Sequence, residues 1–215
     1  HTRFPPLSRG LGDVYKRQVH AISQGLQCLG GSGYCDDYPL EQYYRDCRIH
    51  PIHEGTTGIQ AMDLLGRKLG LKQGKPIMDL LGEIHKTLTE AKAFDGLQEN
   101  AAAVEAAVNK LGEVALHMGK TAMSPKVLSA FAFAHPFQDV CGDVMLAWML
   151  LWRATAAAAA LEAGAKKKDA AFYEGQLKSA EFFIHSILPV TLGKMDAILD
   201  TNSAAVEIED ASFGG

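Results

Sequence analysis

The residues whose types could do chemistry gather in one short segment, Glu54-Gly55-Thr56-Thr57, just before an expected helix. Thr56 or Thr57 can cap that helix, because a threonine hydroxyl accepts a hydrogen bond from a first-turn amide. Glu54 can be an ordinary acid at a helix start, where negative charge is favourable. A desolvated glutamate whose pKa is raised can instead act as a general base. Residue type and position alone leave both roles open.

The same segment also contains the pattern H-x-x-H-E, formed by His50, His53 and Glu54, which suggests zinc. Two histidines bind one zinc ion when a helix aligns them, but Pro51 breaks the helix that would do so. No third, distant ligand is evident in the sequence. We therefore expect no metal site.

Charge and cysteine content exclude several functional classes. The chain of 215 residues has 21 Lys and Arg against 25 Asp and Glu, a net charge of -4. This balance provides no basic surface, so neither nucleic acid nor an anionic membrane is an expected partner. The four cysteines form no C-x-x-C pair and suit small hydrophobic positions in a reducing compartment. We expect a cytoplasmic protein.

The elements that must position the segment are helices, since apolar residues recur at helical spacing and no alternating strand pattern is present. The sequence predicts an all-α helical bundle in two blocks, residues 19–70 and residues 71–200, which join near residues 71–75. Residues 201–215 are small, acidic and glycine-ended, and we expect this tail to fray.

Prolines and glycines set the expected helix ends. The predicted helices span about 19–29, 39–49, 57–69, 76–94, 97–119, 125–135, 136–164, 172–187 and 189–198. Lys166-Lys167-Lys168 is expected to be a solvated turn. The most apolar run, Val144 to Leu161, contains Arg153 and five alanines in a row. We expect a buried bundle helix there and no membrane span.

The first 18 residues differ in character from the rest. Residues 13–18, D-V-Y-K-R-Q, can be back-translated into a sequence that resembles the transposon end of sequencing-library adapters. We interpret residues 1–18 as a non-native segment. The native chain is then expected to enter near Val19, within a longer protein.

Residues 27–69 resemble the C-terminal signature of the acyl-CoA dehydrogenase family. Three motifs carry the resemblance: Q-x-x-G-G-x-G-Y from Gln27, Y-P-x-E-x-x-x-R-D-x-R-I from Tyr38, and E-G-T-x-x-I-Q from Glu54. Linked motifs at the family spacing are specific, whereas G-G-x-G alone would be weak. The remainder resembles, in helical character and position, the C-terminal extension of larger bacterial members, including those that act on methylthiopropanoyl-CoA. The resemblance implies the C-terminal part of such a protein.

The resemblance also implies a chemical role for each residue around Glu54. Members of the family use FAD to oxidise a saturated acyl-CoA to the trans-2-enoyl-CoA, and a glutamate removes the α-proton. That base maps onto Glu54, whose backbone N–H would help to bind the thioester carbonyl oxygen. His53, Glu54 and Gly55 would contact the substrate, with His53 at a position where relatives often have a tyrosine in the acyl pocket.

Two groups of residues would bind FAD by the same resemblance. Thr56, Thr57 and Gly58 would offer hydroxyl and backbone donors to its phosphate and ribityl oxygens. The other group is Gln27, Cys28, Leu29, Gly30 and Gly31, which would contact the adenosine end of FAD bound chiefly by another subunit. The expected assembly is therefore a homo-oligomer, a dimer or a tetramer.

The sequence thus predicts an acyl-CoA dehydrogenase that passes electrons to electron-transfer flavoprotein, with the present chain alone inactive. Two alternatives remain open. An acyl-CoA oxidase would use the same base but give the electrons to oxygen. A non-catalytic helical interaction module could retain the same signature.

Overall fold

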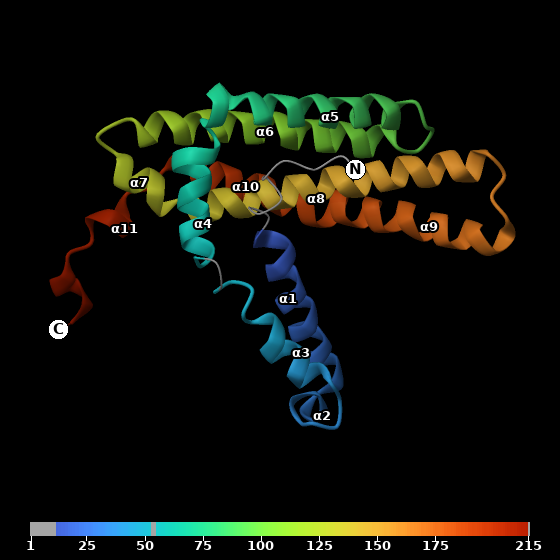
Figure 1. Ribbon diagram of the computed structural model, residues 1–215, viewed down its shortest axis with the longest axis horizontal. Coiled ribbons are helices and arrows are strands. Elements are labelled where there is room, and N and C mark those ends of the chain that lie inside the picture. The colour runs from blue at the N-terminus through green and yellow to red at the C-terminus, as the bar shows by residue number, and fades with distance from the viewer. Residues whose placement is uncertain (1–11, 53–54, 215) are drawn as a thin grey trace.

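Figure 1 shows the computed structural model, which describes residues 12–52 and 55–214. Every regular element within these residues is helical and none is a strand, which confirms the all-α prediction. The elements in chain order are α1 (Gly12–Leu29), α2 (Gly31–Tyr34), α3 (Leu40–Cys47), α4 (Thr57–Asp63), η2 (Leu64–Lys68), η3 (Leu71–Gly74), α5 (Lys75–Lys92), α6 (Gln98–Ala122), α7 (Val127–Ala132), α8 (Ala134–Glu162), α9 (Lys167–Phe182), η4 (Phe183–Ile187), α10 (Leu188–Asp200), α11 (Ala204–Glu207) and η5 (Asp210–Phe213).

The elements α1, α2 and α3 form an arm that projects from the remaining helices (Figure 1). α1 begins at Gly12 and not near Val19. The interpretation of residues 1–18 as non-native stays a prediction, and residues 1–11 lie outside the described residues.

The turn at the end of the arm depends on two glycines. Gly30 ends α1 with φ of 60°, a conformation that glycine adopts at little cost. The expected loop after it contains the short helix α2. A Cβ at Gly33 would lie 2.8 Å from the carbonyl oxygen of Leu26 and 2.9 Å from the Cβ of Leu29, so α2 approaches α1 too closely for a side chain.

α8 is the central helix of the bundle, where it packs against α5, α6, α9 and α10. The side chains that fill this core are branched aliphatics, alanines and a few larger residues, among them Val104, Phe137, Val140, Val144, Leu151, Ile184, Leu188, Met195 and Ile198. Trp148 on α8 is buried, and its Nε1 donates a hydrogen bond of 2.9 Å to Oγ1 of Thr87 on α5. The predicted buried helix at Val144 to Leu161 is therefore confirmed as part of α8.

The first residues after the arm belong to the same core. Ala61 on α4 and Leu64 and Leu65 on η2 are buried in one cluster with residues of α5, α6 and α8. η2 is a π-helical turn, and α4 and η2 follow each other without a break. The two blocks predicted from the sequence therefore share one hydrophobic core.

The connection between η2 and α5 contains consecutive left-handed residues. Lys72 and Gln73 have φ of 47° and 59°, and Gly74 has φ of 79°. The predicted join near residues 71–75 is thus a tight turn, η3, which redirects the chain from η2 into α5 (Figure 1).

One local prediction about the second block was inaccurate, and another was confirmed. The run Lys166-Lys167-Lys168 was expected to be a turn, but α9 already begins at Lys167; the three lysines are exposed, and the turn lies just before them at Gly164, with φ of 82°. Pro189 lies in the first turn of α10, so the expected start of the last helix at this proline is confirmed. The π-helical turn η4 precedes it, so the missing N–H of proline falls in the first turn of α10.

Two helical stretches, 134–162 and 167–200, are long and apolar enough to cross a membrane by length and composition. This is a weak indication, because the core helix of a helical bundle has the same properties. Val140, Val144 and Leu151 of α8 are fully buried against other helices of the chain.

The predicted tail contains two short helical segments, α11 and η5, whose residues are exposed. α11 contacts α7. The end of α10 is held to α6 by a hydrogen bond of 2.5 Å between Nε2 of His117 and Oγ1 of Thr201. The hydroxyl of Thr201 donates to the carbonyl of Ile198, so the imidazole N–H is the donor to Thr201.

Candidate functional site

The segment that carries the E-G-T motif is a short loop between α3 and α4, here called the 51–57 loop. Three hydrogen bonds join its two ends. The amide of Thr56 donates to the carbonyl of Ile52 at 3.3 Å, and the amide of Thr57 donates to the carbonyl of Pro51 at 3.0 Å. Oγ1 of Thr57 donates to the same Pro51 oxygen at 3.4 Å. The loop is therefore closed on itself at its base.

The two threonines of the loop have different surroundings. Thr56 is exposed and, of the two candidates Thr56 and Thr57, is the one that caps α4, because its Oγ1 accepts a 3.4 Å hydrogen bond from the amide of Ile59. Thr57 is half-buried and its hydroxyl is directed to Pro51. Thr56 also has φ of 29°, a conformation that is strained for a residue with a branched side chain. Gly58 is exposed in the first turn of α4.

Two of the predicted site residues, His53 and Glu54, lie outside the described residues, so their predicted roles are not tested by the structure. Gly55, which follows them, has φ of 91°. A Cβ at this position would be strained and would lie 3.4 Å from Cγ2 of Ile59. Glycine is therefore required here by the backbone itself.

The second predicted group lies at the far end of α1. Gln27, Cys28, Gly30 and Gly31 are exposed, and Leu29 is half-buried. A Cβ at Gly31 would have no other atom within 4 Å, and no positive φ requires glycine there. Packing among the described residues therefore does not explain this glycine, whereas it does explain Gly33.

The structure does not bring the two predicted groups together within one copy of the chain. α2 lies at the tip of the arm, whereas α4 lies against the bundle at the other end of α3 (Figure 1). Residues 27–31 and the 51–57 loop therefore lie at different places on the molecule. This separation is compatible with the expectation that they contact different FAD molecules.

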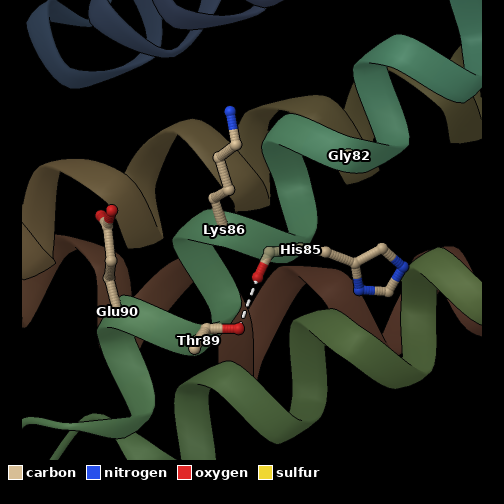
Figure 2. A pocket seen from close by; sticks show the side chains of 5 residues that line it. All are labelled: Gly82, His85, Lys86, Thr89 and Glu90. Atoms are coloured by element: carbon tan, nitrogen blue, oxygen red, sulfur yellow. Dashed lines mark hydrogen bonds between the residues drawn. The ribbon is translucent and has the colours of Figure 1, made fainter.

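Two hollows on the surface involve other residues. One, of about 370 Å³, is lined by Gly82, His85, Lys86, Thr89 and Glu90. Figure 2 shows that all five belong to α5 and that the side chains of His85 and Lys86 point in different directions. Side chains that diverge from a single helix do not converge on a ligand. The hollow therefore suggests no chemistry.

The larger hollow, of about 610 Å³, lies between the turn before α6 and the helices α9 and η4. Its most buried polar residue is Asn100, whose Oδ1 accepts a 2.7 Å hydrogen bond from Nε2 of His185. Lys178 lowers the pKa of Glu181 at its rim, mainly through a 2.7 Å hydrogen bond. Neither hollow contains a residue of the predicted site.

The sequence interpretation missed the polar groups inside the bundle. Asp143 on α8 and Thr191 on α10 are both buried, and Oγ1 of Thr191 donates a 2.6 Å hydrogen bond to Oδ2 of Asp143. An acid spaced among apolar residues was the only available signal. These groups connect helices, and nothing places them near the predicted site.

Sequence models of two known families match most of the chain. The model described as "Acetyl-CoA dehydrogenase C-terminal like" matches residues 80–209, and "Acyl-CoA dehydrogenase, C-terminal domain" matches residues 15–69. The chain belongs to the acyl-CoA dehydrogenase family. The second match includes all three motifs, and the first includes most of the residues that form the bundle.

Several curated members of the acyl-CoA dehydrogenase family are similar along nearly the whole chain. A broad-specificity linear acyl-CoA dehydrogenase of Mycobacterium tuberculosis is 31% identical, over 97% of this chain and 34% of the relative. A 3-methylmercaptopropionyl-CoA dehydrogenase of Ruegeria pomeroyi is 33% identical, over 93% of this chain and 33% of the relative. A butyryl-CoA dehydrogenase of Syntrophomonas wolfei is 29% identical, over 90% of this chain and 32% of the relative. The chain thus spans about a third of the length of these relatives.

Proposed function

We propose that the full-length protein is an FAD-dependent acyl-CoA dehydrogenase in which Glu54 is the base. The observation that carries the proposal is the position of the family's E-G-T motif. It lies on the 51–57 loop, whose ends are joined by hydrogen bonds of the Thr56 and Thr57 amides. Hydrogen bonds between the residues on either side of a general base favour catalysis, because the base must act at a defined distance from the reacting proton.

The residues of the 51–57 loop have distinct roles in this reaction. The carboxylate of Glu54 removes the α-proton of a saturated acyl-CoA and becomes protonated. Its backbone N–H stabilises the negative charge that develops on the thioester oxygen. His53 and Gly55 contact the acyl chain beside it. Exclusion of water by bound substrate would make the carboxylate a stronger base, since desolvation disfavours its charged form.

The described residues fit an FAD cofactor at two places. Thr56 is exposed with its hydroxyl at the start of α4, beside Gly58, and both could contact ribityl or phosphate oxygens. The open surface at Gly30 and Gly31 could accept a flat adenosine group from FAD of another subunit. The chemistry that FAD supplies when bound is acceptance of a hydride from the β-carbon of the acyl chain.

The remaining partners follow from the same proposal. The substrate is a saturated acyl-CoA, and the relatives from M. tuberculosis, R. pomeroyi and S. wolfei are named as dehydrogenases of acyl-CoA compounds. The protein forms a homo-oligomer, because the group at the tip of the arm is separated from the 51–57 loop within one copy. Electrons pass to electron-transfer flavoprotein, and the protein is cytoplasmic.

Anaerobic reduction of the bound flavin by acyl-CoA tests the role of Glu54 in the full-length protein. Glu54→Gln retains size and hydrogen-bonding capacity but cannot accept the proton. Its flavin content should be unchanged, and reduction should slow by roughly a hundredfold to ten-thousandfold, the contribution expected of a general base. Glu83→Gln is the matched control, because Glu83 is exposed on α5 and pairs with Lys86.

Two outcomes of this experiment would change the assignment of Glu54 or the choice of variant. A Glu54→Gln protein that retains its flavin and is reduced at the unsubstituted rate would show that another group is the base. If Glu54→Gln loses flavin, Glu54→Asp is the next variant, because it retains a carboxylate at a displaced position. Reduction of that variant should be slow but measurable.

A further inference from the structure

We infer that the C-terminal tail of one copy of this chain binds the turn between α8 and α9 of a second copy. Two surfaces form this contact. The acidic tail is residues 206–213, which span the end of α11 and all of η5. The lysine tip is Lys166-Lys167-Lys168 together with Phe172 on α9. The contact is separate from the one proposed at the arm and does not depend on the chemistry of Glu54.

The lysine tip carries positive charge that the described residues leave unpaired. Its three lysines are exposed, and none forms an ion pair within the described part of the chain. Lys92 and Lys178, by contrast, each lie within 2.8 Å of a carboxylate oxygen. Asp169, the nearest acid in the sequence, lies in the first turn of α9, where its charge favours the helix start. Phe172 is 64% exposed, so an apolar surface adjoins this charge.

The acidic tail has the complementary chemistry. It contains no basic residue and three exposed acids, Glu207, Glu209 and Asp210. Among the described residues, neither Glu209 nor Asp210 has an ion-pair partner. Ile208 and Phe213 are 49% and 72% exposed. Each surface therefore combines charge with an exposed aromatic ring, and aromatic residues at the centre with charged residues at the rim are typical of protein interfaces.

The two surfaces lie at opposite ends of one copy. Figure 1 shows the turn between α8 and α9 at one end of the bundle and the tail at the other. α8, which runs between these ends, has 29 residues and is therefore about 44 Å long. The tail is also held near the start of α8, because α11 contacts α7. The acidic tail therefore meets the lysine tip of another copy and not its own.

A twofold axis satisfies both surfaces at once. Two copies whose α8 helices run antiparallel bring each acidic tail to the lysine tip of the other copy, so the two contacts are identical and the pair is closed. Opposite charges make each contact attractive, and salt weakens this attraction. An anionic lipid headgroup would supply a partner for the lysine tip but would leave the acidic tail without one. A second copy accounts for both surfaces.

Carbodiimide coupling in the full-length protein tests this contact, because the reagent joins a lysine amine to an adjacent carboxylate without a spacer. Unlabelled and isotope-labelled copies are mixed, so that mass spectrometry distinguishes coupling between copies from coupling within one copy. We expect peptides of the acidic tail to be joined to peptides of the lysine tip across the two labels. Coupling should decrease at about 0.5 M salt, where screening is strong. Lys92 and Glu105, 2.8 Å apart, are the positive control.

Two phenylalanines on α9 provide a matched comparison. Phe172 and Phe182 are each 64% exposed, but only Phe172 belongs to the lysine tip. Phe172→Ser retains every amine and carboxylate that can couple. It should lower tail-to-tip coupling by roughly tenfold, the loss expected when the burial of one aromatic side chain is removed. Phe213→Ser should cause the same loss from the other surface, and Phe182→Ser should leave the coupling unchanged.

An exchange of charges provides a second measurement. One variant combines Lys166→Glu, Lys167→Glu and Lys168→Glu, and the other combines Glu207→Lys, Glu209→Lys and Asp210→Lys. Each variant alone has like charges on both surfaces, whereas an equal mixture of the two has opposite charges at both contacts. Coupling between the two surfaces should therefore return in the mixture and should join only unlike copies.

Three results would overturn the inference. They are the absence of tail-to-tip coupling between copies while Lys92 and Glu105 couple, equal losses in Phe172→Ser and Phe182→Ser, and no coupling in the charge-exchanged mixture. Vesicles of phosphatidylcholine and phosphatidylserine in equal amounts are tested in parallel. Vesicle binding that requires the three lysines, without tail-to-tip coupling, would identify an anionic lipid headgroup as the partner of the lysine tip instead.

Discussion

Thr191 on α10 donates a 2.6 Å hydrogen bond to the buried carboxylate of Asp143 on α8, 48 positions earlier in the chain. Both residues are almost completely shielded from solvent. Lys194, one turn further along α10, lies 3.5 Å from the same carboxylate oxygen but is half exposed. The Thr191 hydroxyl is therefore closer to the Asp143 carboxylate than the Lys194 ammonium is. It connects α10, the last long helix, to α8 at the centre of the bundle.

Removal of that hydroxyl should loosen α10. Thr191→Val retains the shape of the side chain but leaves the buried carboxylate without this donor, a loss of about 1–3 kcal/mol. Amide hydrogen exchange along α10, followed by mass spectrometry, should become faster by roughly five- to a hundredfold if these amides exchange by opening of α10. Thr191→Ser retains the donor, so its exchange should match that of the unsubstituted protein. Equal protection in Thr191→Val would show that the bond contributes nothing to the attachment of α10.

The glycines of the arm should respond differently to the same substitution. Gly33→Ala places a Cβ 2.8 Å from the Leu26 carbonyl oxygen, so the backbone must shift, at a cost of about 1–3 kcal/mol. The Cβ that Gly31→Ala adds would have no other atom within 4 Å. In the full-length protein Gly33→Ala should lower the melting temperature, whereas Gly31→Ala should leave stability unchanged and weaken flavin retention. A Gly31→Ala protein with normal flavin content would mean that the cofactor does not approach this glycine.

The four thiols should react at two different rates. Cys28 and Cys35 are exposed, whereas Cys47 is buried and Cys141 on α8 is half-buried. Burial raises the pKa of the Cys141 thiol to about 12, so at pH 8 this thiol is almost entirely protonated and lacks the nucleophilic thiolate. A disulfide reagent at pH 8 should modify Cys28 and Cys35 quickly, and Cys47 and Cys141 only after denaturation. Rapid modification of Cys141 in the folded chain would contradict the raised pKa of its thiol.

The chain of 215 residues alone should not retain FAD. Its two predicted cofactor groups lie apart, and its relatives are about three times as long. The purified chain should therefore lack the absorbance band at about 450 nm that protein-bound oxidised flavin gives. Addition of free FAD followed by gel filtration should leave the band in the small-molecule fraction. A stoichiometric flavin that travels with the chain would show that these helices suffice for binding.

Most helices could be predicted from the sequence, because their ends coincide with residues that act locally. Gly30 ends α1, and Lys75-Pro76 begins α5. The π-helical turns η2 and η4 could not be predicted, because a shift in the hydrogen-bond pattern depends on packing against other helices. The start of α9 at Lys167 was missed for a related reason, since three adjacent positive charges usually indicate a solvated turn.

Some features of the candidate site could likewise be predicted from the sequence and others could not. The motifs indicated which residues to consider, and residue type predicted that Thr56 or Thr57 caps α4 without deciding between them. The bonds of Thr57 to Pro51 and the φ of 29° at Thr56 could not be derived, because both arise from the closed shape of the loop. The predicted roles of His53 and Glu54 stay predictions.

The shared core of Ala61, Leu64, Leu65 and the later helices has a consequence for modular exchange. The signature motifs and the helical extension look like separable pieces in the sequence, with a natural crossover point near residues 71–75. A chimera that joined this signature to another protein's extension at that point would place these three side chains against a foreign surface. The helix that follows the 51–57 loop would then lose its matched partners, so the two pieces can be exchanged between relatives only together with the contacts between them.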